Sequence, residues 1–156
     1  MPAAQTTVPA PTRAKALEQT LTYRLHLLHK LTDHESQLAY PQETGLSLAT
    51  GRCLAAVGAF EPLSVKALAA RANLNKGQAS RAAQALVDHG LVAKCNSTLD
   101  GRGVVLTLTE AGQRTWRRTM DLIETRNQQI LGCLSDADQT VLSKLLDQLI
   151  VHAQRR

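Results

Sequence analysis

The chain has 156 residues, a formal net charge of +5 and a pI near 9.4. This length suits one compact domain and does not require a second one, and the basic balance favours a polyanionic partner. Aromatic residues make up only 3% of the chain, which argues against a reader of single-stranded nucleic acid and leaves duplex DNA as the expected polyanion.

The first 12 residues contain three prolines among alanines and threonines and lack a helical period, so residues 1–12 are expected to form a disordered tail. No basic segment followed by an apolar core marks a secretory signal. No apolar run approaches the roughly 18 residues of a membrane span. The three cysteines are too far apart for a metal knuckle, and their odd number does not suggest a disulfide framework. We therefore expect a cytoplasmic protein without a metal or another cofactor.

A long amphipathic helix is predicted from Arg13 to Tyr40, where Pro41 should stop it. Its apolar seam consists of Leu17, Leu21, Leu25, Leu28 and Leu31. One small domain does not need a first helix of this length to cover its core, so pairing with a second chain is expected. His26, His29 and His34 lie on the same helix, but no cysteine or second paired histidine lies nearby. They are interpreted as surface or interface residues and not as metal ligands.

A second helix is predicted from Leu46 to Phe60, with Ser47 as its cap. Its inward-facing residues are Leu48, Leu54 and Val57. Gly51 interrupts this helix, and a glycine inside a helix costs about 1 kcal/mol relative to alanine. Two interpretations stay open: the missing side chain enlarges a cavity, or a neighbouring side chain fills the space.

A short helix is predicted after Ser64, which is placed to cap its first turn, and another helix runs from Lys76 to His89. Gly90 should end that helix. Residues 91–95 and 104–108 are expected to form two short strands joined by a polar loop. Two helices at a sharp angle, followed by a hairpin with a basic tip, predict a winged helix-turn-helix, which is a DNA-binding unit.

The second helix of this unit has a predicted buried stripe at Ala79, Ala82, Ala83 and Leu86. Its outward side carries residue types that suit DNA, because arginine can bind guanine, glutamine can bind adenine, and serine or lysine can bind phosphate. Gly77 would let the first turn approach a phosphate closely. The alternative is an ordinary solvated helix face. The candidate DNA-binding residues are Ser64, Lys66, Asn75, Lys76, Gly77, Gln78, Ser80, Arg81, Gln84, Ser97, Thr98 and Arg102.

The hairpin tip contains one cation, Arg102, which is expected to enter the minor groove. Asp100 lies two residues earlier and is interpreted as the partner that orients this arginine. The alternative is an Asp-Gly turn with a solvated arginine.

After the hairpin, Thr109 should cap a helix that Gly132 weakens near its end. Ser135 then caps the last helix. The apolar stripe of that helix consists of Val141, Leu142, Leu145, Leu146, Leu149 and Ile150. Exposing such a stripe would be a liability, so it is expected to pack against a partner in a dimer.

In these motifs the chain resembles the multiple-antibiotic-resistance regulator (MarR) family of bacterial transcription factors. The resemblance extends in pattern over residues 17–150. The matching text is Leu63-Ser64-Val65-Lys66-Ala67-Leu68-Ala69, Ser80-Arg81, His89-Gly90-Leu91-Val92, Asp100-Gly101-Arg102 and Leu108-Thr109-Glu110-Ala111-Gly112.

The resemblance implies an obligate homodimer, with helices from both chain ends forming the dimerisation layer, and it implies an effector cavity. Gly51 stands where the family commonly has an aromatic residue. The candidate residues around such a cavity are His26, Lys30, Gly51 and Arg52.

Taken together, the sequence predicts a mainly α fold with a small β-hairpin wing. Residues 46–112 form the winged helix-turn-helix domain, residues 13–45 an N-terminal dimerisation helix and residues 113–156 the C-terminal dimerisation helices. The predicted function is a homodimeric MarR-like repressor that binds pseudo-palindromic duplex DNA and is released by a small aromatic or other anionic effector. No enzyme is expected, because no P-loop, His-Glu-x-x-His or Gly-x-Ser-x-Gly motif is present. The alternative is a winged-helix module that binds proteins and lacks specific DNA binding.

Overall fold

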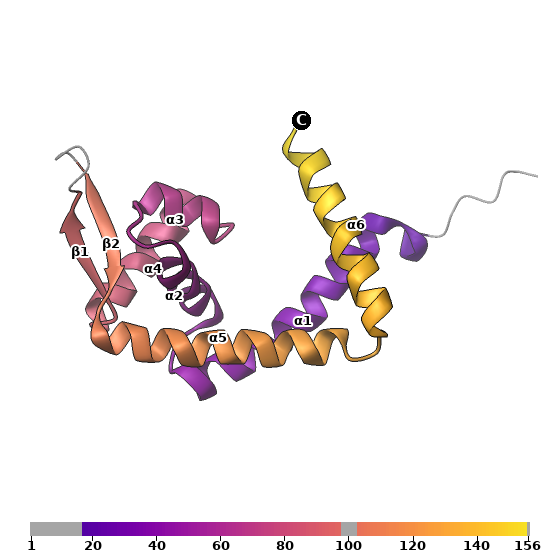
Figure 1. Ribbon diagram of the computed structural model, residues 1–156, viewed down its shortest axis with the longest axis horizontal. Coiled ribbons are helices and arrows are strands. Elements are labelled where there is room, and N and C mark those ends of the chain that lie inside the picture. The colour runs from indigo at the N-terminus through magenta and orange to yellow at the C-terminus, as the bar shows by residue number, and fades with distance from the viewer. Residues whose placement is uncertain (1–16, 98–102, 156) are drawn as a thin grey trace, which may run out of the picture. The chain divides into compact units, whose positions relative to one another are not determined.

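The computed structural model describes residues 17–97 and 103–155 (Figure 1). The predicted tail and the tip of the wing lie outside these residues. The described elements are the short 3-10 turn η1 (Leu17–Gln19), α1 (Leu21–Thr44), α2 (Leu48–Phe60), α3 (Val65–Arg71), α4 (Lys76–Asp88), β1 (Val92–Asn96), β2 (Val104–Leu108), α5 (Glu110–Leu131) and α6 (Asp136–Gln154). The mainly α class with one hairpin is confirmed. The chain divides into two compact units, residues 1–34 and residues 35–156.

The described part of the first unit consists of η1 and the N-terminal part of α1. The prediction of one continuous helix is wrong here, because residues 17–19 form a 3-10 turn and the α-helix begins at Leu21. The Thr20 hydroxyl donates a hydrogen bond to the Leu17 carbonyl oxygen at 2.7 Å, which closes the tighter turn. The leucines of the predicted seam, at positions 17, 21, 25, 28 and 31, are 48–70% exposed.

Helix α1 does not stop at Pro41, and this prediction is also wrong. Proline removes one backbone N–H, but the helix continues to Thr44. The Thr44 hydroxyl donates to the Tyr40 carbonyl oxygen at 2.7 Å and accepts from the Leu46 N–H at 3.2 Å. Gly45, with φ +73°, then ends the helix in the left-handed conformation. These bonds stabilise the last turn. The proline therefore removes one helical hydrogen bond but does not end the helix.

The core of the second unit contains at least one large, fully buried side chain from each of four elements. Leu54 and Val57 of α2, Leu68 of α3, Leu86 of α4 and Leu106 of β2 are all buried below 2% exposure. Each contributes about 1.5–3 kcal/mol through burial. Figure 1 shows these elements grouped at the N-terminal end of α5. The predicted buried stripe of α4 and the inward-facing residues of α2 are confirmed; they are Ala79, Ala82, Ala83, Leu86, Leu48, Leu54 and Val57.

The wing is an antiparallel pair in which Val92 lies opposite Leu108 and Asn96 opposite Val104. Both predicted strands are confirmed to within one residue. An isolated bridge from Leu63 to Leu106 adds a third short segment beside β2. This bridge was not predicted from the sequence, and it ties the start of α3 to the wing through two backbone hydrogen bonds.

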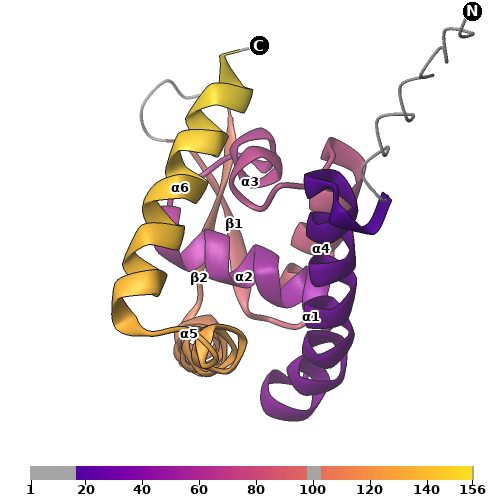
Figure 2. The same cartoon turned by 90° about the vertical axis from the view of Figure 1, so that its right-hand side faces the viewer.

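Helices α5 and α6 begin at the predicted caps. The Thr109 hydroxyl accepts from the Gly112 N–H at 3.0 Å and donates to the Gly90 carbonyl oxygen at 2.6 Å, which ties the start of α5 to the end of α4. The Ser135 hydroxyl caps α6 by accepting from the Asp138 N–H. Figure 2 views α5 end-on and shows α6 leaving it at a steep angle. Helix α6 has no buried residue. Among the helices in the described ranges, none is long and apolar enough to cross a membrane.

Candidate nucleic-acid interface

Helix α4 begins with a complete capping box. The Asn75 Oδ1 atom accepts from the Gln78 N–H at 2.8 Å, and the Gln78 Oε1 atom accepts from the Asn75 N–H at 3.1 Å. Both residues are predicted DNA contacts, and the structure gives them a second role in holding the first turn. Asn-x-x-Gln before a helix is a sequence signal for this box, although the box was not among the sequence predictions.

The exposed side of α4 carries two cations and a hydroxyl. Lys76, Ser80 and Arg81 are exposed and make no hydrogen bond or ion pair with the described residues. A Cβ built on Gly77 would lie 3.6 Å from the Arg81 Nη1 atom, so the guanidinium lies beside the first turn. The free N–H groups of a helix N-terminus also favour anions. This end of α4 is therefore suited to the phosphates and base edges of DNA.

Helix α3 supports α4 from one side. The Ser64 hydroxyl accepts from the Ala67 N–H at 3.1 Å, which confirms the predicted cap, and both Ser64 and Lys66 are exposed. Asn73 takes a φ of +54° in the turn between the helices. Asparagine tolerates this left-handed conformation better than most residues. The turn sets the change of direction that a helix-turn-helix needs.

Gln84 differs from the other candidates on α4, because both ends of its amide already have partners. Its Oε1 atom accepts from the Lys94 ammonium at 2.6 Å, and its Nε2 atom donates to the Asp88 Oδ1 atom at 2.7 Å. Gln84 is predicted as a DNA contact, and in this arrangement its amide faces the wing strand β1 and the end of α4 instead.

Only the base of the wing loop is described. The Ser97 N–H donates to the Gly103 carbonyl oxygen at 2.6 Å, which closes the hairpin. Thr98, Asp100 and Arg102 lie outside the described residues. The role of the wing in the minor groove therefore stays a prediction.

The cavity interpretation of Gly51 is wrong, because Tyr40 fills the space. A Cβ built on Gly51 would lie 2.4 Å from the Cδ1 and Cε1 atoms of the Tyr40 ring. Gly58 lies two turns later on α2, and the Trp116 ring occupies the space beside it in the same way. A Cβ built on Gly58 would lie 2.3 Å from the indole Nε1 atom. The Trp116 Nε1–H also donates to the Ala55 carbonyl oxygen at 3.2 Å. The other alternative, that a neighbouring side chain fills the space, is confirmed.

The remaining effector candidates, His26, Lys30 and Arg52, are exposed. His26 and Lys30 belong to the first unit, so their link to a cavity stays a prediction. No group of three His, Cys, Asp or Glu side chains able to hold a metal ion occurs in the part of the chain that the structure describes.

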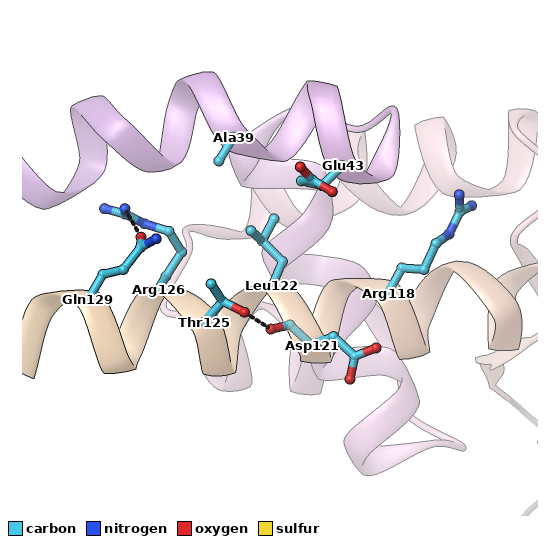
Figure 3. Close-up of a pocket in the computed structure, with 8 residues that line it drawn as sticks. All are labelled: Ala39, Glu43, Arg118, Asp121, Leu122, Thr125, Arg126 and Gln129. Carbon is cyan, nitrogen blue, oxygen red and sulfur yellow. Dashed lines mark hydrogen bonds between the residues drawn. The ribbon is translucent and has the colours of Figure 1, made fainter.

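A cavity of about 510 Å³ lies between the last turns of α1 and the middle of α5 (Figure 3). The Arg126 side chain is only 11% exposed, and its Nη2 atom pairs with the Glu35 Oε2 atom at 2.8 Å. Its Nη1 atom donates to the Gln129 Oε1 atom at 2.5 Å, whereas its buried Nε atom has no partner among the described residues. The lining residues are Ala39, Glu43, Arg118, Asp121, Leu122, Thr125, Arg126 and Gln129.

This cavity was not predicted from the sequence. The α5 residues that line it recur at helical spacing, at positions 118, 121, 122, 125, 126 and 129, and so share one face. This spacing is the only signal that could have found them, and it does not reveal that α1 leaves space opposite.

The two crossed helices with a capped, basic second helix, followed by an antiparallel hairpin, define a winged helix-turn-helix DNA-binding protein. Residues 44–103 match the profile of the MarR family. The chain is 27% identical over 108 residues to the HTH-type transcriptional regulator BilQ of Clostridium symbiosum, which covers 69% of this chain and 75% of that protein.

Solved structures agree with this match. A MarR family transcriptional regulator from Silicibacter pomeroyi has a TM-score of 0.80 and 23% identity, with 95% of this chain and 100% of that chain covered. A MarR family protein of Mycobacterium tuberculosis in complex with salicylic acid has a TM-score of 0.70 and 25% identity, with 86% and 99% covered. Residues 44–103 are therefore similar to the MarR family of DNA-binding transcriptional regulators, and the fold of the chain is that of solved members of this family. Members of this family are not enzymes, and the family favours DNA binding over the protein-interaction alternative.

Proposed function

We propose that the chain is a homodimeric, cytoplasmic repressor that binds a pseudo-palindromic duplex and is released by a small aromatic or other anionic effector. The observation that carries this proposal is the exposure of apolar stripes at both ends of the chain. In α6 the exposed fractions of Val141, Leu145, Leu146, Leu149 and Ile150 are 41–54%. A second copy would cover these side chains, and two copies would present two α4 helices to one duplex.

Dimerisation is tested by placing charge on the stripe. The variant Leu145→Asp/Leu149→Asp should give a monomer in light scattering and should lose specific operator affinity at the same time. Gln148→Asp adds a charge to an exposed polar position of the same helix and should leave the dimer intact. A wild-type chain that is monomeric at micromolar concentration would overturn the proposal.

The two α4 helices should enter successive major grooves, about 10 base pairs apart. Arg81→Ala should lose about 1–3 kcal/mol at particular base pairs if the guanidinium reads a base edge. Lys76→Ala should weaken binding to all operator variants alike and flatten the salt slope by about one per subunit, as expected of a phosphate contact. Lys144→Ala removes an exposed cation from α6 and serves as the control.

The wing supplies a separate test of the same function. Arg102→Ala should lower affinity, flatten the salt slope by about one per subunit and weaken the preference for A·T-rich flanks. Asp100→Ala should cost less, because it would disturb the order of the wing and not a DNA contact. Wild-type affinity of Arg102→Ala across a salt titration would exclude the wing from the interface.

We place the effector in the cavity between α1 and α5. Its volume of about 510 Å³ lies within the range of small-molecule sites. Arg118 and Arg126 supply positive charge, and Leu122 supplies an apolar surface between them. Glu43 and Asp121 also line the cavity and could accept hydrogen bonds from a hydroxyl group. A hydroxylated aromatic carboxylate matches this lining, and the similar protein of Mycobacterium tuberculosis is in complex with salicylic acid.

Salicylate is therefore the first probe. Arg126→Gln should weaken salicylate binding in calorimetry and raise the concentration needed to release the operator. Arg114→Gln is the control, because Arg114 lies on α5 outside the cavity and pairs with Glu110. Release of Arg126→Gln at the wild-type concentration would remove this cavity from the proposal. A reporter gene under the operator then decides between repression and activation.

A further inference from the structure

Three side chains form a continuous chain of hydrogen bonds from the recognition helix to the wing. The Lys94 ammonium of β1 donates to the Gln84 Oε1 atom at 2.6 Å, and the Gln84 Nε2 atom donates to the Asp88 Oδ1 atom at 2.7 Å. Gln84 and Asp88 lie one turn apart on α4, so the chain links α4 with the first strand of the hairpin.

The charges at the two ends fix the orientation of the Gln84 amide. The ammonium of Lys94 can only donate, and the carboxylate of Asp88 can only accept. A flipped amide would direct its NH₂ group at the cation and its oxygen at the anion, which loses both hydrogen bonds. Both bonds involve an ionised partner and are stronger than neutral ones. One orientation of Gln84 is therefore preferred.

These two hydrogen bonds are incompatible with recognition of a base by the Gln84 amide. A glutamine that recognises adenine uses its amide oxygen and its amide nitrogen together. Gln84 could do so only by releasing Lys94 and Asp88. Lys76, Ser80 and Arg81 have no such partners among the described residues and stay available to DNA.

The position of Lys94 along β1 determines how strongly its hydrogen bond to Gln84 affects the direction of the hairpin. Val92 is buried and Ala93 is half-buried, whereas Lys94, Cys95 and Asn96 are exposed. Lys94 is therefore the first residue at which β1 leaves the core. A two-stranded hairpin is only marginally stable by itself, so its direction beyond this point depends on what holds its base. Each further residue extends the strand by about 3.3 Å, which turns a small change of angle at the base into a larger displacement of the wing.

We propose that Gln84 is a positioning residue, which braces the wing against α4 through Lys94 and Asp88 and does not read a base. This inference rests on the proposed function only in that α4 and the wing bind the same duplex. The brace itself is a property of the free protein, so it can be measured with and without DNA.

The test is a double-mutant cycle of Gln84→Ala and Lys94→Ala in the full-length protein, measured on an operator panel in which each base pair of one half-site is changed in turn. Each single variant should weaken binding to every operator by a similar factor, about 2- to 5-fold, as expected of an exposed contact that contributes about as much as a surface ion pair. The double variant should be no weaker than either single variant, because the same link is lost once. The salt slope should not change, and Lys94→Arg, which keeps a donor for Gln84, should restore affinity.

Two results on DNA would overturn the brace. A loss of about 5- to 150-fold confined to one base pair in Gln84→Ala would show that Gln84 reads a base edge. Additive losses with a salt slope flattened by about one per subunit in Lys94→Ala would show that Lys94 contacts a phosphate.

Hydrogen exchange of the free protein separates the brace from DNA binding. Gln84→Ala and Lys94→Ala should each speed the exchange of the β1 amides, and the double variant should add nothing further. Unchanged exchange in the single variants would reject the brace even for a protein that binds its operator. A wild-type chain that binds no duplex would instead reject the proposed function, and the exchange result would still decide the brace.

Discussion

Replacing Gly51 with alanine tests the packing of α2 against α1. The glycine is buried, and its missing side chain leaves the space that the Tyr40 ring occupies. An added Cβ would lie 2.4 Å from two ring carbons, which is closer than van der Waals contact permits. Tyr40 is only 3% exposed, so its ring has no path into solvent and the backbones of α1 and α2 must separate.

Two opposing terms set the size of the effect. Alanine gains about 1 kcal/mol over glycine inside a helix. Forcing an extra carbon into a packed core costs about 1–3 kcal/mol. The rigid, buried ring places Gly51→Ala in the upper part of that range, so we expect a net loss of about 1–2 kcal/mol. For a domain of this size, each kcal/mol lowers the melting temperature by about 2–4 °C.

Urea unfolding at one fixed protein concentration measures this loss, because the stability of the proposed dimer would depend on concentration. Gly77→Ala is the matched control: its built Cβ would meet nothing closer than 3.5 Å, so it should not destabilise the protein. In a Tyr40→Leu background, which removes the ring, Gly51→Ala should cost nothing. Equal stability of Gly51→Ala and Gly77→Ala, or the same loss in both backgrounds, would refute the reasoning.

The remaining predictions concern α4 and the cysteines. Gly77→Ala should weaken operator binding while the free energy of unfolding stays level or rises, because its methyl group would stand between the first turn and a phosphate; unchanged affinity would exclude that close approach. Gln78→Ala should lower both stability and affinity for all operator variants, since its Oε1 atom caps α4; a loss at a single base pair with unchanged stability would contradict this role. Burial raises the pKa of the Cys53 thiol to about 11, so a maleimide at pH 8 should label the exposed Cys95 and Cys133 and spare Cys53 until the protein unfolds, as read by mass spectrometry.

Features that depend on neighbours along the chain were predictable from the sequence. The caps at Ser47, Ser64, Thr109 and Ser135 each need a hydroxyl three residues before the N–H that it accepts, and all four are confirmed. The buried stripe of α4 follows from helical period in the same way. These predictions succeed because the interacting groups are one helical turn apart and need no knowledge of the fold.

Features that depend on residues distant in the chain were not predictable in this way. A glycine in a helix indicates that another group packs closely against the backbone, but it does not identify that group. The group beside Gly51 is the Tyr40 ring, which lies 11 positions earlier in the chain. The bridge from Leu63 to Leu106 and the bond from Lys94 to Gln84 likewise need the positions of elements in space. The prediction that Pro41 ends the helix was wrong for a different reason. The low helix propensity of proline takes no account of the hydrogen bonds that the Thr44 hydroxyl makes in the last turn.

The exposed apolar stripe of α6 links the folding of this helix to the proposed dimerisation. Helix α6 runs from Asp136 to Gln154, yet none of its side chains is buried. Most helices in proteins owe their stability to the packing of an apolar face, and its cap at Ser135 and the acidic first turn supply only about 1–2 kcal/mol between them. In the proposed dimer, a second copy buries this stripe. The two α4 helices would then reach DNA as a pair whose spacing is set by the same contacts that stabilise α6, so a change on that stripe acts on stability, dimerisation and operator affinity together.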